Sequence, residues 1–338
     1  EQQYLMIIAE IGQAHDGSLG ILHSYIDALA PTGVDAIKFQ THIAEAESSD
    51  YEQFRIPFSY VDKTRYDYWQ RMELSLEQWM EVKAHCDAAG VQFISSPFSC
   101  AAIDLLEKVG IQQYKVGSGE VTNHLLLQKI ADTNKPVILS SGMSNLNELE
   151  SAIQIFTQKN MPVSVLQCTT AYPTTPNQWG LHILKLLKDR FKIAIGFSDH
   201  SGDIFAALAA TALGAELIEV HAVFDKRMFG PDAKASLEID EIVRLVKGIK
   251  DIKQSLGNSF SKDEEAQSFT GLKTLFGKSL AVNKELPEGH IVSFDDLEAK
   301  KPAGKGIAAK DYTYCVGATL QRHMYRWEFL NDNDIQFL

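Results

Sequence analysis

Two lysines in apolar surroundings are the first sign of chemistry in this chain. Lys38 and Lys115 each lie in a short apolar, β-branched segment, and lysine is rarely buried without a partner. Hydroxyl side chains and Gly-rich turns follow similar segments, as in Ser95-Ser96, Gly117-Ser118-Gly119 and Ser140-Ser141-Gly142. Point charges, hydroxyls and backbone N–H groups at helix starts together suit an anionic ligand that carries phosphate or carboxylate.

The same lysines also have a purely structural interpretation. Lys38 and Lys115 could pair with Glu10 and Glu120 as ion pairs that bind no ligand. That arrangement would satisfy buried charges without any activity. The residues alone leave both interpretations open, although two such lysines favour a ligand more than one would.

Two histidines suggest a metal site. His200 and His221 end consecutive apolar segments and flank Glu219, so their imidazoles could approach each other. Two histidines with an oxygen ligand and open positions suit a divalent metal of the Mn, Zn or Fe type. The competing interpretation is a pair of histidines satisfied by ordinary hydrogen bonds. His15 follows the first apolar segment and could face the same site.

The apolar segments that would position these residues alternate with stretches of helical spacing. Eight segments are predicted as strands: residues 4–9, 34–39, 91–94, 113–116, 136–139, 163–166, 193–195 and 217–220. Continuous apolar strands that alternate with amphipathic helices indicate a parallel sheet covered by helices. Eight such units in about 250 residues predict an α/β chain with a closed (β/α)8 TIM barrel, here over residues 1–256. Reacting groups would then project from the carboxyl ends of the strands.

The one long interval between predicted strands holds an insertion, residues 42–75. It is rich in aromatic side chains, namely Tyr51, Phe54, Phe58, Tyr60, Tyr66, Tyr68 and Trp69. On a barrel the insertion would follow the second strand, at the active end. It is predicted either to form a lid over the site or to pack against the barrel wall.

The chain changes character after residue 256. Residues 257–275 are polar and are predicted to be a linker, and residues 276–338 to form a small β-rich domain. Within that domain, residues 285–297 and 323–335 share apolar and acidic positions at identical spacing, which predicts two similar half-units. The turn residue Gly289 of the first half corresponds to Trp327 in the second.

Composition excludes several classes of function. The 338-residue chain has a formal net charge of −12 and no run of five Lys or Arg, so nucleic acid and anionic membranes are not predicted partners. No apolar segment approaches the roughly 18 to 20 residues of a membrane span. Four widely spaced cysteines indicate reduced thiols. We therefore expect a cytoplasmic protein with a small-molecule partner.

Nine motifs in the same order give the chain a family resemblance. They are Ile8-Ala9-Glu10-Ile11-Gly12, Ile37-Lys38-Phe39-Gln40-Thr41, Phe93-Ile94-Ser95-Ser96-Pro97-Phe98, Tyr114-Lys115-Val116-Gly117-Ser118-Gly119-Glu120, Leu139-Ser140-Ser141-Gly142-Met143, Cys168-Thr169-Thr170-Ala171-Tyr172-Pro173, Gly196-Phe197-Ser198-Asp199-His200, Glu219-Val220-His221 and Gly230-Pro231-Asp232. Together they resemble the sialic acid synthase (N-acetylneuraminate synthase) family. The segment from Gly277 to Pro302 resembles the antifreeze-like (SAF, β-clip) domain that this family carries after its barrel.

The resemblance implies a reaction. Phosphoenolpyruvate would condense with the open-chain aldehyde of an N-acylated mannosamine-type sugar, giving a nine-carbon 2-keto acid of the sialic, legionaminic or pseudaminic type and phosphate. It also implies a divalent metal, typically Mn²⁺ with Mg²⁺ or Co²⁺ as alternatives, held by His200 and His221. A metal would polarise the aldehyde, and lysines would neutralise phosphate and carboxylate.

The resemblance also implies roles for individual residues. Glu10, Lys38, Lys115 and His221 are the candidate catalytic residues, Glu10 as a carboxylate that transfers a proton or positions water. Phosphoenolpyruvate would be held by Lys38, Ser96, Lys115, Ser118, Ser140 and Ser198, while Gln40, Phe98, Glu120, Thr170, Tyr172, Glu219, Asp232 and Lys301 complete the substrate-binding set.

Three positions depart from the family pattern and put the sugar in doubt. Lys301 stands where arginine is usual, Thr170 where asparagine is common, and Phe229 where proline is frequent. An ammonium does not replace a guanidinium fork like-for-like. The family further implies a domain-swapped homodimer in which Lys301 serves the partner's site. The rival interpretations are another phosphoenolpyruvate-condensing barrel that makes a 3-deoxy keto acid, and a non-catalytic carbohydrate-binding protein.

Overall fold

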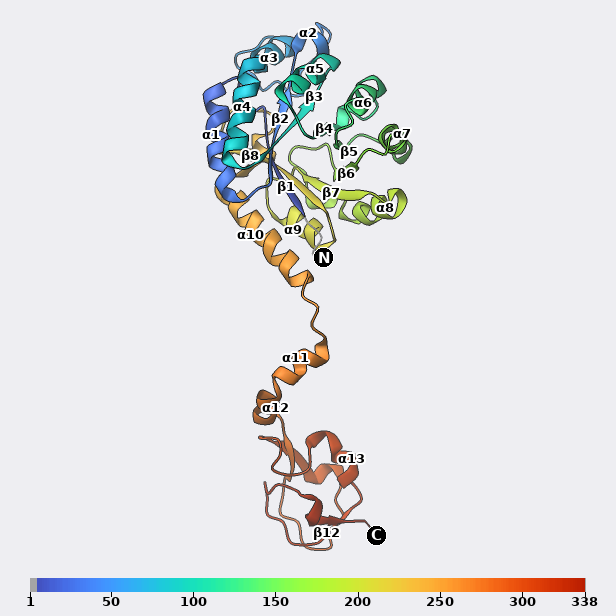
Figure 1. The fold of residues 1–338 in the computed structure, drawn as a ribbon. Coiled ribbons are helices and arrows are strands. Elements are labelled where there is room, and N and C mark those ends of the chain that lie inside the picture. The colour runs from blue at the N-terminus through green and yellow to red at the C-terminus, as the bar shows by residue number, and fades with distance from the viewer. Residues whose placement is uncertain (1–4, 338) are drawn as a thin grey trace. The chain divides into compact units, whose positions relative to one another are not determined.

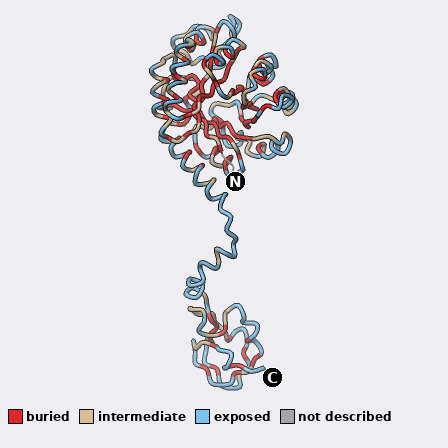
Figure 2. Tube along the Cα trace, in the orientation of Figure 1, coloured by how far each residue is buried: buried red, intermediate tan, exposed pale blue. Residues whose placement is uncertain are grey.

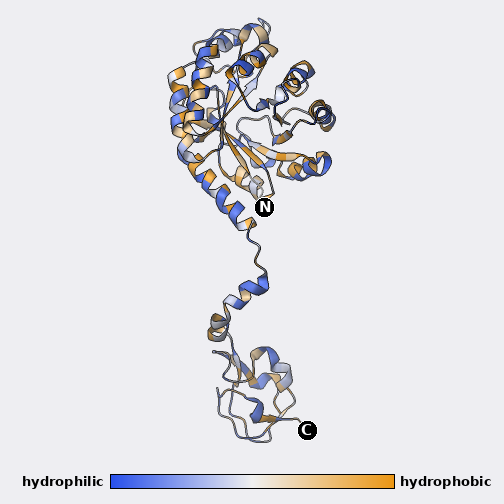
Figure 3. Ribbon diagram, in the orientation of Figure 1, coloured by the Kyte–Doolittle hydropathy of each residue, from blue (hydrophilic) through white to orange (hydrophobic). Residues whose placement is uncertain are grey.

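The chain divides into two compact units, residues 1–257 and 258–338. A computed structural model describes residues 5–337 (Figure 1). Each unit has its own buried core. Buried residues are red in Figure 2, and hydrophobic residues are orange in Figure 3. No helix within residues 5–337 is long and apolar enough to cross a membrane.

The first unit is the predicted barrel. Its parallel strands are β1 (Met6–Gly12), β2 (Ala36–Thr41), β3 (Gln92–Pro97), β4 (Tyr114–Val116), β5 (Val137–Ser140), β6 (Val163–Cys168), β7 (Ala194–Asp199) and β8 (Leu217–Val223). They pair in chain order, and β1 also pairs with β8, so the sheet closes on itself. All eight predicted strands are confirmed, and most extend further toward their carboxyl ends than predicted. Tyr4, in the first predicted segment, lies outside the described residues.

Helices cover the outside of the barrel. They are α1 (Leu19–Leu29), α4 (Leu76–Ala89), α5 (Cys100–Val109), α6 (His124–Ala131), α7 (Leu146–Thr157), α8 (Leu181–Phe191), α9 (Phe205–Ala212) and α10 (Ile239–Leu256). Several begin at a side chain that accepts a backbone N–H of the first turn, as Ser75 does for α4 and Ser99 for α5. Both of these helices end at a left-handed glycine, Gly90 or Gly110.

Inside the barrel an apolar layer lies directly below the predicted site. It consists of Ile8, Ala36, Ile94, Ile138, Leu166 and Leu217. Successive residues of a strand face opposite sides, so the residue two positions later shares the interior face. Those residues are Glu10, Lys38, Ser96, Ser140, Cys168 and Glu219. The strand pattern therefore sets a layer of polar side chains on an apolar floor.

The insertion after β2 forms two short helices, α2 (Ala44–Glu47) and α3 (Arg65–Met72). Tyr68, Trp69 and Met72 of α3 form a buried cluster with Ala44. Phe54, Phe58 and Tyr66 pack against that cluster, while Tyr51 and Tyr60 are exposed. The packing interpretation therefore holds for most of these aromatic residues.

The second unit has two small antiparallel sheets. β10 (Ser279–Val282) pairs with β11 (Leu297–Lys300), and β12 (Thr319–Leu320) pairs with β13 (Ile335–Gln336). The unit also holds α13 (Tyr312–Cys315). The predicted linker, residues 257–275, contains two short helices, α11 (Lys262–Ser268) and α12 (Thr270–Phe276), and α12 extends one residue beyond it. Neither helix has a buried residue.

The two predicted half-units are confirmed. Leu286 and Met324, at matching positions, exchange both backbone hydrogen bonds at 2.9 Å. The corresponding turn residues share a left-handed backbone, with φ of 80° at Gly289 and 72° at Trp327. Trp327 thus adopts the left-handed backbone conformation that usually favours glycine.

Packing inside the barrel leaves no room for a side chain at Gly196 in β7. A Cβ there would lie 2.4 Å from the Leu217 carbonyl oxygen and 2.6 Å from a Leu166 methyl group. Overpacking of this kind costs roughly 1–3 kcal/mol, so Gly196→Ala should lower the free energy of unfolding by that amount in urea titrations. Gly20→Ala in α1, where the nearest atom is 3.9 Å away, serves as the control. Equal stability of the two variants would contradict this packing.

Candidate active site

A cavity of about 790 Å³ opens at the carboxyl ends of the barrel strands. Fifteen of the 17 predicted site residues line it: Glu10, Lys38, Gln40, Ser96, Phe98, Lys115, Ser118, Ser140, Thr170, Tyr172, Ser198, His200, Glu219, His221 and Asp232. They come from all eight strands or the loops that follow them. Closure of the barrel therefore brings together side chains that lie more than 200 positions apart.

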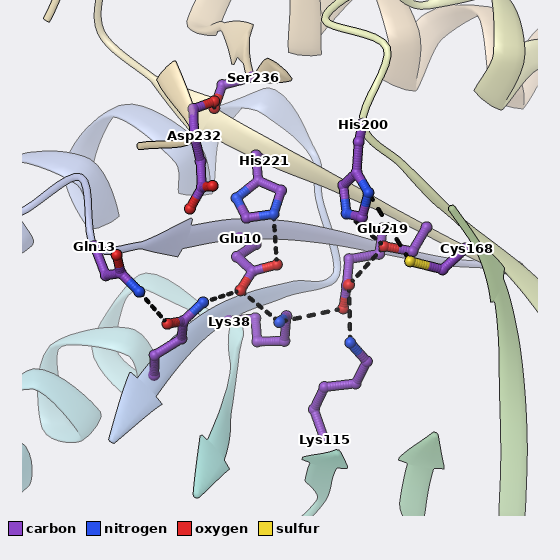
Figure 4. Close-up of polar contacts among 12 residues, drawn as sticks. Glu10, Gln13, Lys38, Lys115, Cys168, His200, Glu219, His221, Asp232 and Ser236 are labelled. Carbon is purple, nitrogen blue, oxygen red and sulfur yellow. Dashed lines mark hydrogen bonds and ion pairs between the residues drawn. The ribbon is translucent and has the colours of Figure 1, made fainter. Parts of the chain in front are cut away.

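At the base of the cavity two lysines and two glutamates form a buried charge network (Figure 4). Lys38 Nζ lies 2.6 Å from Glu10 Oε1 and 3.7 Å from Glu219 Oε2. Lys115 Nζ donates to Glu219 Oε1 at 3.0 Å. The structural interpretation was right about Lys38 and Glu10. It was wrong about Lys115. The side chains of Lys115 in β4 and Glu219 in β8 both point into the barrel, so the partner of this lysine is Glu219 and not Glu120.

Burial and mutual attraction act in opposite directions on these four groups. Burial would raise the pKa of Glu10 and of Glu219, but the neighbouring cations outweigh it and hold both pKa values below the usual range. For Lys38, Glu10 and Glu219 outweigh burial and raise its pKa. Lys115 differs, because burial dominates and lowers its pKa despite Glu219. The network thus keeps its carboxylates ionised.

Glu10 is fixed by contacts to both of its carboxylate oxygens. Oε1 accepts from Lys38 and, at 2.9 Å, from Gln40 Nε2, while Oε2 lies 3.2 Å from His221 Nε2. A hydrogen-bonded chain leads to this point: Tyr68 donates to Gln13 at 2.8 Å, and Gln13 donates to Gln40 at 2.9 Å. Every donor in this chain points toward Glu10. The arrangement suits an ionised anchor more than a residue that transfers a proton.

The two imidazoles lie above the charge network, with their ring centroids 5.4 Å apart. His200 Nδ1 lies 2.9 Å from the Thr169 carbonyl oxygen. A carbonyl only accepts, so Nδ1 carries the proton and Nε2 keeps a free lone pair. Ser198 Oγ, 3.5 Å away, is the polar neighbour of that nitrogen. A carbonyl that orients an imidazole in this way is typical of metal-ligating histidines.

The donor set fits a divalent metal only in part. Two imidazole nitrogens and the adjacent Glu10 carboxylate are the ligand types that Mn²⁺ or Zn²⁺ prefers. Within residues 5–337, however, no three His, Cys, Asp or Glu side chains converge as a ready-made metal site. Substrate or water oxygens would have to complete the ligand set.

The upper wall of the cavity is aromatic and partly charged. The Tyr172 ring stacks on His200 at a centroid distance of 4.2 Å and meets His221 edge-on at 6.0 Å. Asp232 lines the cavity near Tyr172. One further feature points to a ligand at the base: Ser96 Oγ is buried and has no hydrogen-bond partner among the described residues.

Several cavity residues were missed by the sequence analysis. Gln13, Arg55, Arg65, Cys168, Lys226 and Lys234 are among them. Cys168 stands in a quoted motif but was considered only as a free thiol. The insertion was predicted either to form a lid or to pack against the barrel wall, and its contribution of Arg55, Phe58, Arg65 and Trp69 to the cavity wall is compatible with both. Nothing in the residue pattern singled out Arg55.

Three residues named from the sequence do not line the cavity. Glu120 accepts from Asn123 Nδ2 at 2.8 Å, beyond the end of β4. Lys301 belongs to the second unit, where its Nζ lies 4.9 Å from the centroid of the Phe276 ring. His15 is buried and its Nδ1 accepts the Gly17 N–H at 3.1 Å.

Comparison with known proteins gives consistent matches. Residues 25–261 match the NeuB family. The chain is 35% identical to an N,N'-diacetyllegionaminic acid synthase of Campylobacter jejuni, with 97% of this chain and 99% of that protein covered. It is 31% identical to the human N-acetylneuraminate-9-phosphate synthase, covering 94% and 88%. It also resembles a crystal structure of the N-acetylneuraminic acid synthetase of Leptospira borgpetersenii in complex with citrate, with a TM-score of 0.71, 30% identity, and coverage of 80% and 93%.

Buried His15 predicts a pH dependence of stability. Burial, reinforced by His42 and Arg71, lowers its pKa from 6.5 to about 4 in the folded chain. Between these values the unfolded chain binds the proton first, so stability falls as pH decreases from 6.5 to 4, by on the order of 3 kcal/mol. In His15→Gln this part of the pH dependence should disappear in urea titrations across that window. Above pH 7 the two proteins should respond alike. An unchanged slope between pH 6.5 and 4 would refute the assignment.

Proposed function

Because this chain belongs to the NeuB family, we propose that it condenses phosphoenolpyruvate with the open-chain aldehyde of an N-acylated mannosamine-type sugar. The products are a nine-carbon 2-keto acid and phosphate. The observation that carries this proposal is that two buried lysines, Lys38 and Lys115, line one cavity with Ser96, whose hydroxyl has no partner within residues 5–337. The full-length match to a legionaminic acid synthase supports it.

The charge balance at the base of the cavity supports a bound cation. Lys38 and Lys115 contribute +2, and Glu10 and Glu219 contribute −2, so the network is neutral before substrate arrives. Phosphoenolpyruvate carries up to about three negative charges near neutral pH, and buried charge must be compensated. A divalent cation would supply most of the missing positive charge.

His200 and His221 are the residues proposed to hold that cation, with Mn²⁺ as the first candidate and Mg²⁺ or Co²⁺ as alternatives. The support is the oriented Nε2 of His200 and the nearby Nε2 of His221. When bound, the metal would act as a Lewis acid on the aldehyde oxygen. Glu10, whose Oε2 lies 3.2 Å from that His221 nitrogen, would remain ionised beside the cation.

The proposed reaction forms one carbon–carbon bond and breaks one carbon–oxygen bond. C3 of phosphoenolpyruvate bonds to the aldehyde carbon, a water oxygen bonds to C2, and the C2–O bond breaks so that phosphate leaves. The two protons of that water end on the new hydroxyl and on phosphate. Lys38 and Lys115 donate hydrogen bonds to the phosphate and carboxylate from below. Ser96, Ser118 and Ser140 line the same cavity, and we propose that they donate to these oxygens.

The rival interpretations have less support. A barrel that makes a 3-deoxy keto acid would share the base of the cavity, but the relatives reported above are named as a legionaminic acid synthase and an N-acetylneuraminate-9-phosphate synthase. A non-catalytic carbohydrate-binding protein has no need for four buried charges beneath two histidines. A homodimer in which Lys301 serves the partner's site stays a prediction.

Removal of one cation should test the proposal directly. Lys115→Ala takes a positive charge from the base of the cavity, so phosphate release from phosphoenolpyruvate and an N-acylated mannosamine should fall at least about 100-fold. Lys129→Ala, whose lysine pairs with Asp104 on the outer surface, should keep wild-type turnover. Near wild-type phosphate release by Lys115→Ala would contradict the assignment.

The metal proposal is tested by titration. After dialysis against a chelator, Mn²⁺ binding measured by calorimetry should be at least about 10-fold weaker in His221→Gln than in the wild type. Turnover should fall with it, because the imidazole and the cation are proposed to act together. Unchanged Mn²⁺ affinity in the variant would show that His221 is not a ligand.

A further inference from the structure

Arg55 in the insertion is a charged residue that the proposed reaction does not yet use. It lines the cavity and its side chain is exposed. Its guanidinium lies over the Tyr172 ring, 4.9 Å from the centroid. Among the described residues its side chain has neither an ion pair nor a hydrogen bond. An arginine at a cavity wall with all of its donors unused is available to a ligand.

The other cavity arginine of the insertion, Arg65, differs from Arg55 because its side chain has a carboxylate partner. Arg65 also lines the cavity, but its Nε lies 3.4 Å from Glu52 and its guanidinium covers the Trp69 ring at 4.1 Å. Those contacts account for it as a structural residue. Arg55 stacks on the Tyr172 ring, but within the described residues no carboxylate pairs with it.

The position of Arg55 assigns it to the acceptor end of the cavity. His200, Tyr172 and Arg55 form a column of planar groups, with Tyr172 stacked on His200 at 4.2 Å and Arg55 above Tyr172. The two lysines are buried at the base of the cavity, below the imidazoles (Figure 4). A substrate that places its aldehyde near the imidazoles would extend its remaining atoms toward Tyr172 and Arg55.

The chemistry of this wall selects one kind of substituent. A guanidinium donates five hydrogen bonds and accepts none, so its ligand must be an oxygen acceptor. The next cavity residues on the same segment, Ile56 and Phe58, are apolar. An acylamino group matches both features, because its carbonyl oxygen accepts hydrogen bonds while its methyl group seeks apolar surface.

We propose that Arg55 is a specificity-determining residue that binds the carbonyl oxygen of an acylamino substituent on the acceptor sugar, with Ile56 and Phe58 beside the acyl methyl group. This inference rests on the proposed condensation with phosphoenolpyruvate. An anionic group would also bind a guanidinium, so the experiment must separate an acyl oxygen from a sugar phosphate and from phosphoenolpyruvate itself.

The test compares acceptors that differ in one substituent. Phosphate release is measured as kcat/KM for N-acetylmannosamine, its 4-acetamido-6-deoxy analogue, its 6-phosphate, and mannose, which has a hydroxyl in place of the acetamido group. The proteins are the wild type, Arg55→Ala, Arg55→Lys, and Arg190→Ala, an exposed arginine that pairs with Glu150 on the outer surface. Thermal midpoints confirm that each variant is folded.

We expect Arg55→Ala to lose about 10- to 100-fold in kcat/KM for the acetamido sugars, the range for a hydrogen bond to a charged group. Its activity on mannose should stay within about twofold of wild type, as should KM for phosphoenolpyruvate. For the acetamido sugars, the kcat/KM of Arg55→Lys should lie between those of Arg55→Ala and the wild type, because an ammonium keeps the charge but lacks the planar fork. Arg190→Ala should match wild type on every acceptor.

Each other outcome contradicts the proposal in a distinct way. An equal loss on mannose would make Arg55 a general structural residue. A loss confined to the 6-phosphate would assign it to a sugar phosphate, and a raised KM for phosphoenolpyruvate would assign it to that anion. No phosphate release by the wild type with any acceptor would refute the proposed function, and the inference would fall with it.

Discussion

The structure depends on four charges buried at the centre of a barrel. Burying an ammonium or a carboxylate without a partner costs several kcal/mol, and Lys38, Lys115, Glu10 and Glu219 avoid that cost only by alternating in sign within a few ångströms. A network of this kind adds little to stability compared with well-packed apolar residues. Its persistence at the base of a large cavity is therefore best explained by a substrate whose negative charge it receives.

The barrel makes the network possible because strand geometry fixes two layers at once. Residues such as Ile8, Ile94 and Leu217 close the floor, and the residues two positions later in the same strands form the site. The insertion adds a second level of control, because Tyr68 in its buried cluster begins the hydrogen-bonded chain that ends on Glu10. The same insertion supplies Arg55 to the acceptor wall.

Much of this arrangement could be predicted from the sequence, for physical reasons. Apolar β-branched segments that alternate with amphipathic helices leave few solutions other than a parallel barrel, and the barrel dictates that strand ends converge. Side-chain partners are harder to predict, because they depend on register and rotamers. The structural interpretation paired Lys115 with Glu120, five residues away in sequence, whereas its partner Glu219 comes from β8 across the barrel.

The insertion marks the other limit of prediction. Its aromatic content was compatible with both a lid and packing, and five of its residues line the cavity. No periodic pattern distinguishes an arginine that faces a ligand, such as Arg55, from one that pairs with a carboxylate, such as Arg65. The partner of an arginine in a loop is set by the loop conformation, which short-range spacing does not determine.

The central claim is that the buried lysines and the two imidazoles serve one phosphorylated three-carbon acid, and a crystal structure of the chain with phosphoenolpyruvate and Mn²⁺ tests it most directly. The account predicts that the acid lies at the base of the cavity with its phosphate and carboxylate oxygens within hydrogen-bond distance of Lys38, Lys115 and Ser96, and that the cation lies beside His200 and His221. Phosphoenolpyruvate bound elsewhere, with the lysines still paired only to Glu10 and Glu219, would contradict it.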